Sequence, residues 1–153
     1  MMSGPVIPPG MRRALDEAAA AAGAGEVPVG AALVDDNGTV IAANGNRVER
    51  DRDPTAHAEM LVLRAGAARL GVKRLAGCDL YVTLEPCPMC AAAIALAHIR
   101  RLYFAAWDPK GGGVEHGPRL FAQPTCHHRP EVYGGIAERA AAGLLRQFFA
   151  GRR

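Results

Sequence analysis

The spacing of apolar residues divides the first half of the chain into helical and extended segments. Alanine-rich residues 11–22 carry polar side chains on one side and predict a first helix. Two short apolar runs, 29–34 and 40–43, flank the turn-forming sequence DDNG and predict an antiparallel hairpin. The apolar pattern at 56–70 follows the helix-start sequence DPT, so it predicts a second helix with His57 in its first turn.

The second half of the chain continues this alternation. The sequence DLYVTLEP is rich in β-branched and aromatic residues and predicts a strand that Pro86 ends, because proline cannot extend a β-ladder. The remaining elements are predicted in this order: a helix at 87–99, a strand at 100–106, a long surface loop at 108–130 with a short helix at 119–122, a strand at 132–133 and a helix at 136–149. Strands interleaved with helices in this way favour a sheet that is covered on both faces.

Length and composition fit one folded domain that spans residues 1–153. Hydrophobic residues make up 50% of the chain and charged residues 22%, which is typical of globular proteins and argues against disorder. We expect residues 1–10, which include three prolines and lack the pattern of a secretory signal, to form a flexible N-terminus. No apolar stretch is long enough to cross a membrane, so the expected location is the cytoplasm. The net charge of +3 is too small to indicate a nucleic-acid partner by itself.

Two closely spaced cysteines indicate a metal site. Cys87 and Cys90 are three residues apart at a predicted helix start, so their sulfurs lie on one face and can approach one cation. The helix dipole favours the thiolate form there, which is the form that binds metal. His57 is the best candidate for a third ligand, because it also opens a helix after a pair of strands. Three protein ligands leave a fourth position for water, which is typical of catalytic zinc.

Glu59 has a different predicted role from that of its neighbour His57. Residues two apart on a helix do not share a face, so Glu59 is poorly placed to bind the same ion. Zinc lowers the pKa of a bound water from 15.7 toward about 7, and a carboxylate within hydrogen-bonding reach can take that proton and return it to a substrate. We therefore expect His57 to hold the metal and Glu59 to move protons.

Other cysteines and histidines leave structural alternatives open. Cys78 or Cys126 is available as a fourth ligand, which would make the zinc site purely structural. The sequence CHH at 126–128 is a second possible metal cluster, but adjacent histidines point in different directions, so loop structure is the favoured interpretation. His98 and His116 have no partner that the sequence identifies.

The combination of HAE with PCPMC thirty residues later resembles the signature of zinc-dependent nucleoside and nucleobase deaminases. The resemblance extends to GEVPVGAALV, NGNRV, DPTAHAEM, LYVTLEPCPMC, the segment from Asp108 to Lys110, HHR and LLRQFFAGRR. Together these segments are similar to bacterial tRNA-specific adenosine deaminases over almost the whole chain, from about Arg12 to Arg153.

This resemblance implies a fold, a reaction and a set of site residues. The fold would be a three-layer α/β/α cytidine-deaminase-like fold, with a central mixed five-stranded sheet and helices on both faces. The protein would be a homodimer with one Zn²⁺ in each subunit that converts the wobble adenosine of a tRNA anticodon loop to inosine. At the metal, the resemblance implies that His57, Cys87 and Cys90 bind zinc, that Glu59 transfers protons and that the Cys87 N–H orients the attacking oxygen. Around the metal, it implies that Asn46, Val29 and Leu84 bind the base. Further out, Asp108 and Lys110 would contact neighbouring nucleotides, and Phe148 and Phe149 would shape the RNA groove.

One segment departs from the family pattern, and two other functions remain open. After the loop aspartate, where many members carry a Lys-Thr-Gly-Ala-like segment, this chain has DPKGGGVEHG, which affects the expected RNA contacts but not the zinc chemistry. A guanine, cytosine or nucleoside deaminase would use the same zinc site. A zinc-containing RNA-binding protein without catalysis is the third hypothesis, and Glu59 argues against it because a structural site does not need this carboxylate.

Overall fold

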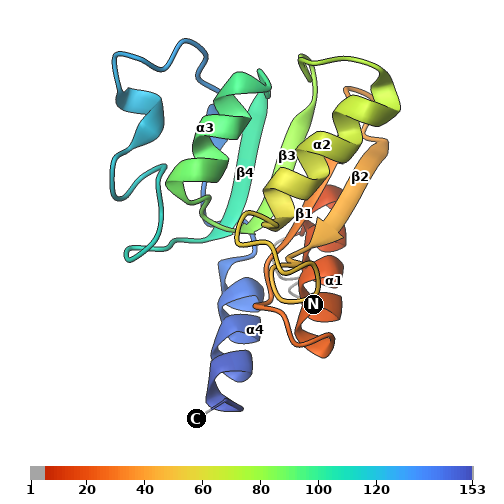
Figure 1. Ribbon diagram of the computed structural model, residues 1–153, viewed down its shortest axis with the longest axis vertical. Helices are drawn as coiled ribbons and strands as arrows, with labels where there is room; N and C mark the ends of the chain where they lie inside the picture. The colour runs from red at the N-terminus through yellow and green to blue at the C-terminus, as the bar shows by residue number, and fades with distance from the viewer. Residues whose placement is uncertain (1–5, 153) are drawn as a thin grey trace.

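The computed structural model describes residues 6–152, and its elements follow the predicted order (Figure 1). They are α1 (Pro9–Gly23), β1 (Gly30–Val34), β2 (Val40–Gly45), α2 (Ala58–Leu70), β3 (Asp79–Leu84), α3 (Pro88–Leu96), β4 (Arg101–Ala106), the short 3₁₀ helix η1 (Leu120–Ala122), β5 (Glu131–Tyr133) and α4 (Glu138–Ala150). None of the described helices is long and apolar enough to span a bilayer.

The five strands form one mixed sheet in the order β2-β1-β3-β4-β5. β1 runs antiparallel to both β2 and β3, with Ala32 opposite Ala43 on one side and opposite Tyr81 on the other. β3, β4 and β5 run parallel, and Leu80 lies beside Leu102. The parallel half needs crossover connections, which α3 and the long loop supply.

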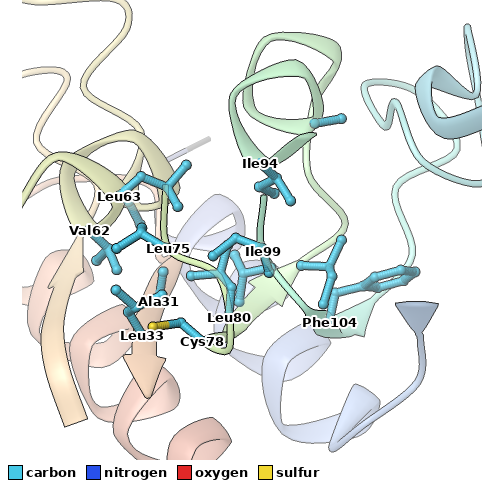
Figure 2. Close-up of a cluster of buried hydrophobic side chains, with 14 of the residues drawn as sticks. Ala31, Leu33, Val62, Leu63, Leu75, Cys78, Leu80, Ile94, Ile99 and Phe104 are labelled. Carbon is cyan, nitrogen blue, oxygen red and sulfur yellow. The ribbon is translucent and has the colours of Figure 1, made fainter. Parts of the chain in front are cut away.

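Helices cover both faces of the sheet, which confirms the predicted three-layer architecture (Figure 1). α2 and α3 pack over the larger apolar cluster, in which Leu33, Val62, Leu80, Ile94 and Phe104 are buried (Figure 2). α1 and the beginning of α4 cover the opposite face through small side chains, chiefly alanines. Small side chains of this kind let a helix approach a sheet closely.

α1 lies so close to β1 that one position admits only glycine. A Cβ atom at Gly30 would lie 2.0 Å from the carbonyl oxygen of Ala14 and 2.6 Å from the backbone nitrogen of Ala18. The N–H of Gly30 also donates to the hydroxyl of Thr83 on β3 over 3.1 Å. The close approach of α1 to Gly30 fixes the distance between this helix and the start of β1, which Val29 directly precedes.

Two local predictions are wrong at their boundaries. Of the expected flexible segment 1–10, residues 1–5 lie outside the described residues, but Pro9 and Gly10 already belong to α1. Proline begins a helix readily, since the first helical N–H has no intrahelical partner. The helix predicted at 87–99 ends at Leu96, because His98 takes a left-handed conformation with φ of 59° that a helix cannot continue.

Candidate metal centre and active site

The N-termini of α2 and α3 bring His57, Cys87 and Cys90 together. His57 and Cys87 are the N-cap residues of the two helices, both with extended backbones, and neither side chain caps its own helix. His57 therefore precedes the first turn of α2, which corrects the prediction that it lies within that turn. Because an N-cap side chain is not confined to the helix surface, both residues can turn toward the gap between the helices.

The donor set fits a zinc ion. The Nδ1 atom of His57 lies 3.6 Å from the Cys87 sulfur and 3.5 Å from the Cys90 sulfur. Around a tetrahedral zinc ion with ordinary bond lengths, a nitrogen and a sulfur ligand lie about 3.6 Å apart. All three ligand atoms are within 4.8 Å of one another, and within residues 6–152 no other group of three such side chains meets this condition.

The four-ligand structural alternative finds no support in the described residues. Cys78 is buried in the apolar cluster beneath α2, and burial raises the pKa of its thiol. Cys126 lies in the long loop, where its sulfur donates to the carbonyl oxygen of His128 over 3.2 Å. Neither sulfur joins the ligand group of His57, Cys87 and Cys90. A set of three protein ligands leaves the coordination position that catalytic zinc sites keep for water.

The two ligand sulfurs share a negative charge in the protein without metal. Hydrogen bonding from the Cys90 thiol lowers the pKa of Cys87 to about 4, and His57 contributes in the same direction. The Cys87 thiolate and burial together raise the pKa of Cys90. One proton therefore stays between the sulfurs until a cation replaces it, since a metal ion stabilises both thiolates.

Glu59 lies in the first turn of α2 and is almost completely buried, with 4% of its surface exposed. Burial raises the pKa of its carboxyl group to about 7, and the negative charge of the Cys87 thiolate adds to the rise. A carboxyl group with a pKa near neutrality can both accept and donate a proton under physiological conditions. Its burial beside the three ligands therefore suits the proton-transfer role predicted from the sequence.

A cavity of about 770 Å³ opens onto these groups. His57, Glu59 and Cys87 line it, together with Val29 and Leu84, the two apolar residues expected to contact a base. Such a volume is in the range of small-molecule sites, and a mixture of apolar walls with a few polar groups is typical of them.

Asn46 lies on the wall of this cavity in a fixed orientation. Its backbone N–H donates to the Val29 carbonyl over 3.0 Å, and its Oδ1 accepts the N–H of Ala58 over 2.8 Å. Ala58 stands between the metal ligand His57 and Glu59, so this bond ties Asn46 directly to the start of α2. Because Oδ1 is occupied by the Ala58 N–H, the NH₂ group of the amide is the end available to a ligand in the cavity.

Residues 9–106 match the family model described as the cytidine and deoxycytidylate deaminase zinc-binding region, which covers most of the chain and all three ligands. The chain belongs to this family. A zinc ion is therefore its cofactor, in agreement with the ligand distances.

Relatives of this deaminase include one protein of high identity. The chain is 59% identical over 143 residues to the tRNA-specific adenosine deaminase of Agrobacterium fabrum, covering 94% of this chain and 93% of the relative. A solved structure from a study of A-to-I editing by tRNA:A34 deaminases is 58% identical, with a TM-score of 0.87 and coverage of 89% and 98% of the two chains. A guanine deaminase from Nitrosomonas europaea is more distant, at 28% identity and a TM-score of 0.78, with coverage of 98% and 87%.

The outer residues predicted for substrate contact are only partly gathered at the cavity of the deaminase. Asp108 lines it, but Lys110 and Phe149 lie outside its lining. Phe148, the other phenylalanine predicted to shape the RNA groove, does line it, together with Arg152, whose guanidinium lies 4.0 Å from the centre of the Phe148 ring. Helical rotation explains this difference, because consecutive residues of α4 point in directions about 100° apart.

Two buried carboxylates near the cavity were missed in the sequence. Glu26 accepts N–H bonds from Glu49 and Arg50, and Glu85 accepts a cluster of N–H bonds from the segment that follows β4. Burial raises the pKa of each carboxyl group, but the hydrogen bonds outweigh burial and hold both values below the ordinary one. The only signal in the sequence was a single glutamate within each of two otherwise apolar segments, Glu26 in GEVPVG and Glu85 in LEPC.

Three of the four histidines outside the metal site have structural partners among the described residues. His98 stacks on His128 with ring centroids 4.5 Å apart, and the Nε2 of His128 lies 2.8 Å from the Ile99 carbonyl oxygen. His116 pairs with Glu85 through its Nδ1 over 2.8 Å. The prediction that residues 126–128 serve loop structure agrees with these contacts.

Proposed function

We propose that this zinc-dependent deaminase converts the wobble adenosine of a tRNA anticodon to inosine. The observation that supports this function best is the position of the buried Glu59 beside the ligand set of His57, Cys87 and Cys90 at one cavity. The high identity to relatives named for tRNA adenosine deamination favours adenosine in tRNA as the substrate. Water and adenosine are consumed, and inosine and ammonia are released.

The side chains of the site divide the work of the hydrolysis. His57, Cys87 and Cys90 hold zinc, which when bound acidifies a water molecule so that it becomes a nucleophile at neutral pH. Glu59 would take one proton from this water and deliver it to the ring nitrogen beside the amine-bearing carbon. It would then move the remaining proton from the added oxygen to the amine, which leaves as ammonia. The N–H of Cys87, at the N-cap of α3, is proposed to orient the attacking oxygen.

The cavity walls are proposed to select and hold the base. Val29 and Leu84 contact the faces of the ring, and the NH₂ group of Asn46 donates to a ring acceptor. A base must leave its stack to enter a site of this depth, and an unpaired anticodon loop makes that less costly than a duplex does. This requirement favours a loop in tRNA, an RNA of the cytoplasm, where we propose that the enzyme acts.

The surface around the cavity is proposed to contact the neighbouring nucleotides. Asp108 stands at the rim, and Lys110 follows it in the same turn. Phe148 and Arg152 extend the wall from α4, and Phe149, which is half exposed, packs edge to face against Phe148. An aromatic and cationic rim of this kind provides stacking surfaces for unpaired bases and charge for phosphates.

A homodimer is the second part of the proposal. Leu96 at the end of α3 is 79% exposed, beside a hollow between α2 and α3 that Met60, Leu63 and Ala93 help to line. Leu70 and Val72 are also partly exposed at the far end of α2. Exposed large apolar side chains favour burial against a second copy, which the molecular mass in solution tests.

A substrate panel separates adenosine deamination from the alternatives. Purified protein is incubated with an adenosine-containing anticodon stem-loop, with cytidine and with guanine, and inosine, uridine and xanthine are measured. Inosine formed within the RNA, without uridine or xanthine, is the expected result. Xanthine as the main product would instead assign the chain to guanine deamination, the activity named for its relative from Nitrosomonas europaea.

The role of Glu59 has its own test. Glu59→Ala is expected to lower kcat on the stem-loop by about 10²–10⁴-fold, since it removes the group that transfers protons. Zinc content should stay near one ion per chain, because His57, Cys87 and Cys90 are unchanged. Normal activity in this variant would refute the assignment, whereas equal loss of zinc would show that Glu59 supports the metal site instead.

A further inference from the structure

The segment from Asp108 to His116 is folded around a single buried carboxylate. The side chain of Glu85 is fully buried, and it accepts five N–H groups from this one segment. The donors are the backbone N–H groups of Asp108 at 3.0 Å, Val114 at 3.2 Å, Glu115 at 2.9 Å and His116 at 3.2 Å, and the Nδ1–H of His116 at 2.8 Å. These five donors surround the Glu85 carboxylate in the way that a loop of backbone N–H groups surrounds a bound anion.

Glu85 lies two positions before the metal ligand Cys87 in the chain. Glu85 follows the end of β3, its own N–H donates to Ala106 over 2.8 Å, and Pro86 alone separates it from Cys87. Glu85 and Asp108 both line the cavity. The position of the segment is therefore set from the same stretch of backbone that delivers a ligand to the zinc ion.

The three consecutive glycines allow the segment to approach this backbone. A Cβ atom at Gly112 would lie 2.4 Å from the Glu85 Oε2, and one at Gly113 would lie 2.6 Å from the backbone nitrogen of Pro88. The Gly113 N–H donates to the Pro86 carbonyl over 2.8 Å. The sequence DPKGGGVEHG, which departs from the family pattern, thus has a structural reason in this chain: side chains at these positions would push the segment away from α3.

The rim of the cavity is built on the part of the segment that Glu85 holds. While Glu85 accepts the backbone N–H of Asp108, the Oδ1 of Asp108 accepts the N–H groups of Lys110 at 3.2 Å and Gly111 at 3.0 Å. Residues 108–111 therefore form a turn whose first residue is anchored by Glu85. Any shift of the anchor moves the whole turn relative to the metal ligands.

We propose that the Glu85–His116 pair is a positioning element that fixes the turn 108–111 on the cavity rim for the nucleotides flanking the target base. This inference rests on the proposed function, in which Asp108 and Lys110 contact those nucleotides. His116 supplies the one side-chain donor among the five, and its imidazole is one-third exposed. It can therefore be replaced without opening the core, whereas substitution of Glu85 would leave four backbone N–H groups without their acceptor.

The test compares two substitutions of His116 with a control in the same segment. His116→Ala removes the donor, and His116→Asn keeps one because its Nδ2 can take the place of the imidazole Nδ1–H. Glu115→Gln is the matched control: its side chain accepts the Trp107 Nε1–H over 2.6 Å on the exposed side, and its backbone N–H to Glu85 is unchanged. For each protein we would measure hydrogen exchange of the 108–116 peptide, affinity for the stem-loop by fluorescence anisotropy, zinc content, kcat and KM.

His116→Ala is expected to speed exchange in the 108–116 peptide and to raise the Kd and KM for the stem-loop about tenfold, the size that loss of one charge-assisted hydrogen bond gives. The value of kcat should stay within about twofold, and zinc content should not change, because the ligands and Glu59 are intact. His116→Asn should restore most of the affinity. Glu115→Gln should match the unsubstituted protein.

Other outcomes overturn the proposal in distinguishable ways. Faster exchange with unchanged RNA affinity would show that the pair only stabilises the segment. Weak binding that His116→Asn fails to restore would show that ring volume matters and not the donor. If the unsubstituted chain binds the stem-loop without deaminating it, the proposed reaction fails, but the exchange and anisotropy data still decide whether the pair positions the rim.

Discussion

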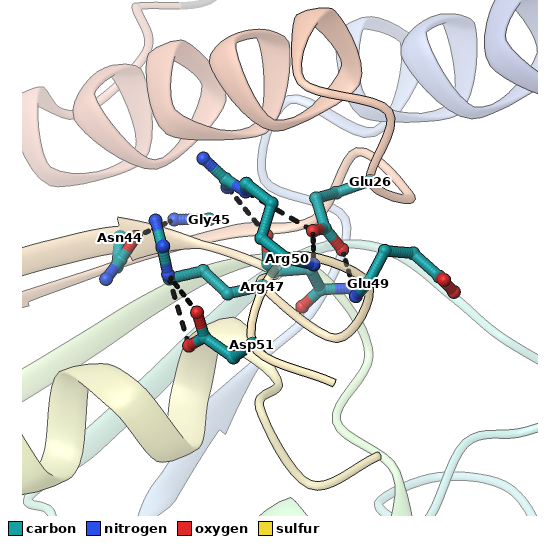
Figure 3. Close-up of polar contacts among 8 residues, drawn as sticks. Glu26, Asn44, Gly45, Arg47, Glu49, Arg50 and Asp51 are labelled. Carbon is teal, nitrogen blue, oxygen red and sulfur yellow. Dashed lines mark hydrogen bonds and ion pairs between the residues drawn. The ribbon is translucent and has the colours of Figure 1, made fainter. Parts of the chain in front are cut away.

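Replacing Glu26 with alanine is expected to lower the free energy of unfolding by about 3 kcal/mol, although this residue touches neither the metal ligands nor the apolar core. The Glu26 carboxylate is fully buried under the turn formed by residues 46–53. It accepts the backbone N–H of Glu49 at 3.0 Å, the N–H of Arg50 at 2.8 Å and the Arg50 Nε–H at 3.3 Å (Figure 3). Its own N–H donates to Ala21 at the end of α1, so it joins that helix to the turn.

The magnitude follows from the donors that would lose their acceptor. Two backbone N–H groups that are left unpaired in a buried site cost about 1–3 kcal/mol each, so the range is roughly 2–6 kcal/mol. Water can reach part of the space beside Arg50, whose side chain is 36% exposed, and this reduces the expected loss toward the lower half of the range. A value near 3 kcal/mol is a large fraction of the stability of a typical domain.

The same turn contains a matched control. Arg47 and Asp51 form an ion pair of 3.0 Å in which both side chains are more than one-third exposed (Figure 3). Exposed pairs of this kind contribute about 0.2–1 kcal/mol, because solvent screens their attraction. Asp51→Ala should therefore cost less than about 1 kcal/mol, even though it removes an ion pair and lies only a few residues away.

Urea unfolding followed by circular dichroism at pH 7 measures both variants under one condition. Glu26→Ala should also weaken substrate binding, because the Arg50 Nη2 donates to the Asn46 carbonyl over 3.1 Å and the Asn46 side chain is tied to α2. The reasoning is refuted if Glu26→Ala and Asp51→Ala lose the same free energy of unfolding. Equal losses would mean that the buried carboxylate is no more important than a surface ion pair.

Three further predictions concern pH, packing and the metal. Because the pKa of Glu26 is lowered in the folded protein, its contribution to stability should be complete above the ordinary pKa of 4.5 and should be lost as the pH falls through the pKa of the folded state. Glu26→Gln should therefore make the free energy of unfolding less dependent on pH in this range. Gly30→Ala, which places a Cβ atom 2.0 Å from the Ala14 carbonyl, should lower stability by about 1–3 kcal/mol or more in thermal unfolding, and an unchanged midpoint would contradict the close packing of α1. After zinc is removed with a chelator, Cys87 should react with an alkylating reagent even near pH 6, since the pKa of its thiol is about 4. In the zinc-loaded protein Cys87 should be protected. Equal labelling of the two forms would argue against metal binding by Cys87.

The sequence alone determined the order of the elements and the residues that gather at the centre of the site. Hydrophobic periodicity, together with proline and glycine at the boundaries, is a local signal, and it predicted all five strands and the helices that separate them. The metal ligands and Glu59 were also accessible, because Cys87 and Cys90 share one helix turn and His57 precedes another helix start. Each of these signals is local, although the site that they form joins His57 to cysteines 30 and 33 residues further along the chain.

The tertiary structure decided which distant groups meet. Glu26 finds its partners 23 and 24 residues away, and the Glu85 carboxylate binds an imidazole 31 residues further along the chain. It also placed His57 before the first turn of α2, and it turned Phe148 rather than Phe149 toward the cavity. A buried carboxylate must be paired wherever the fold buries it, but its partner is chosen by the packing of strands and loops, which no local pattern encodes.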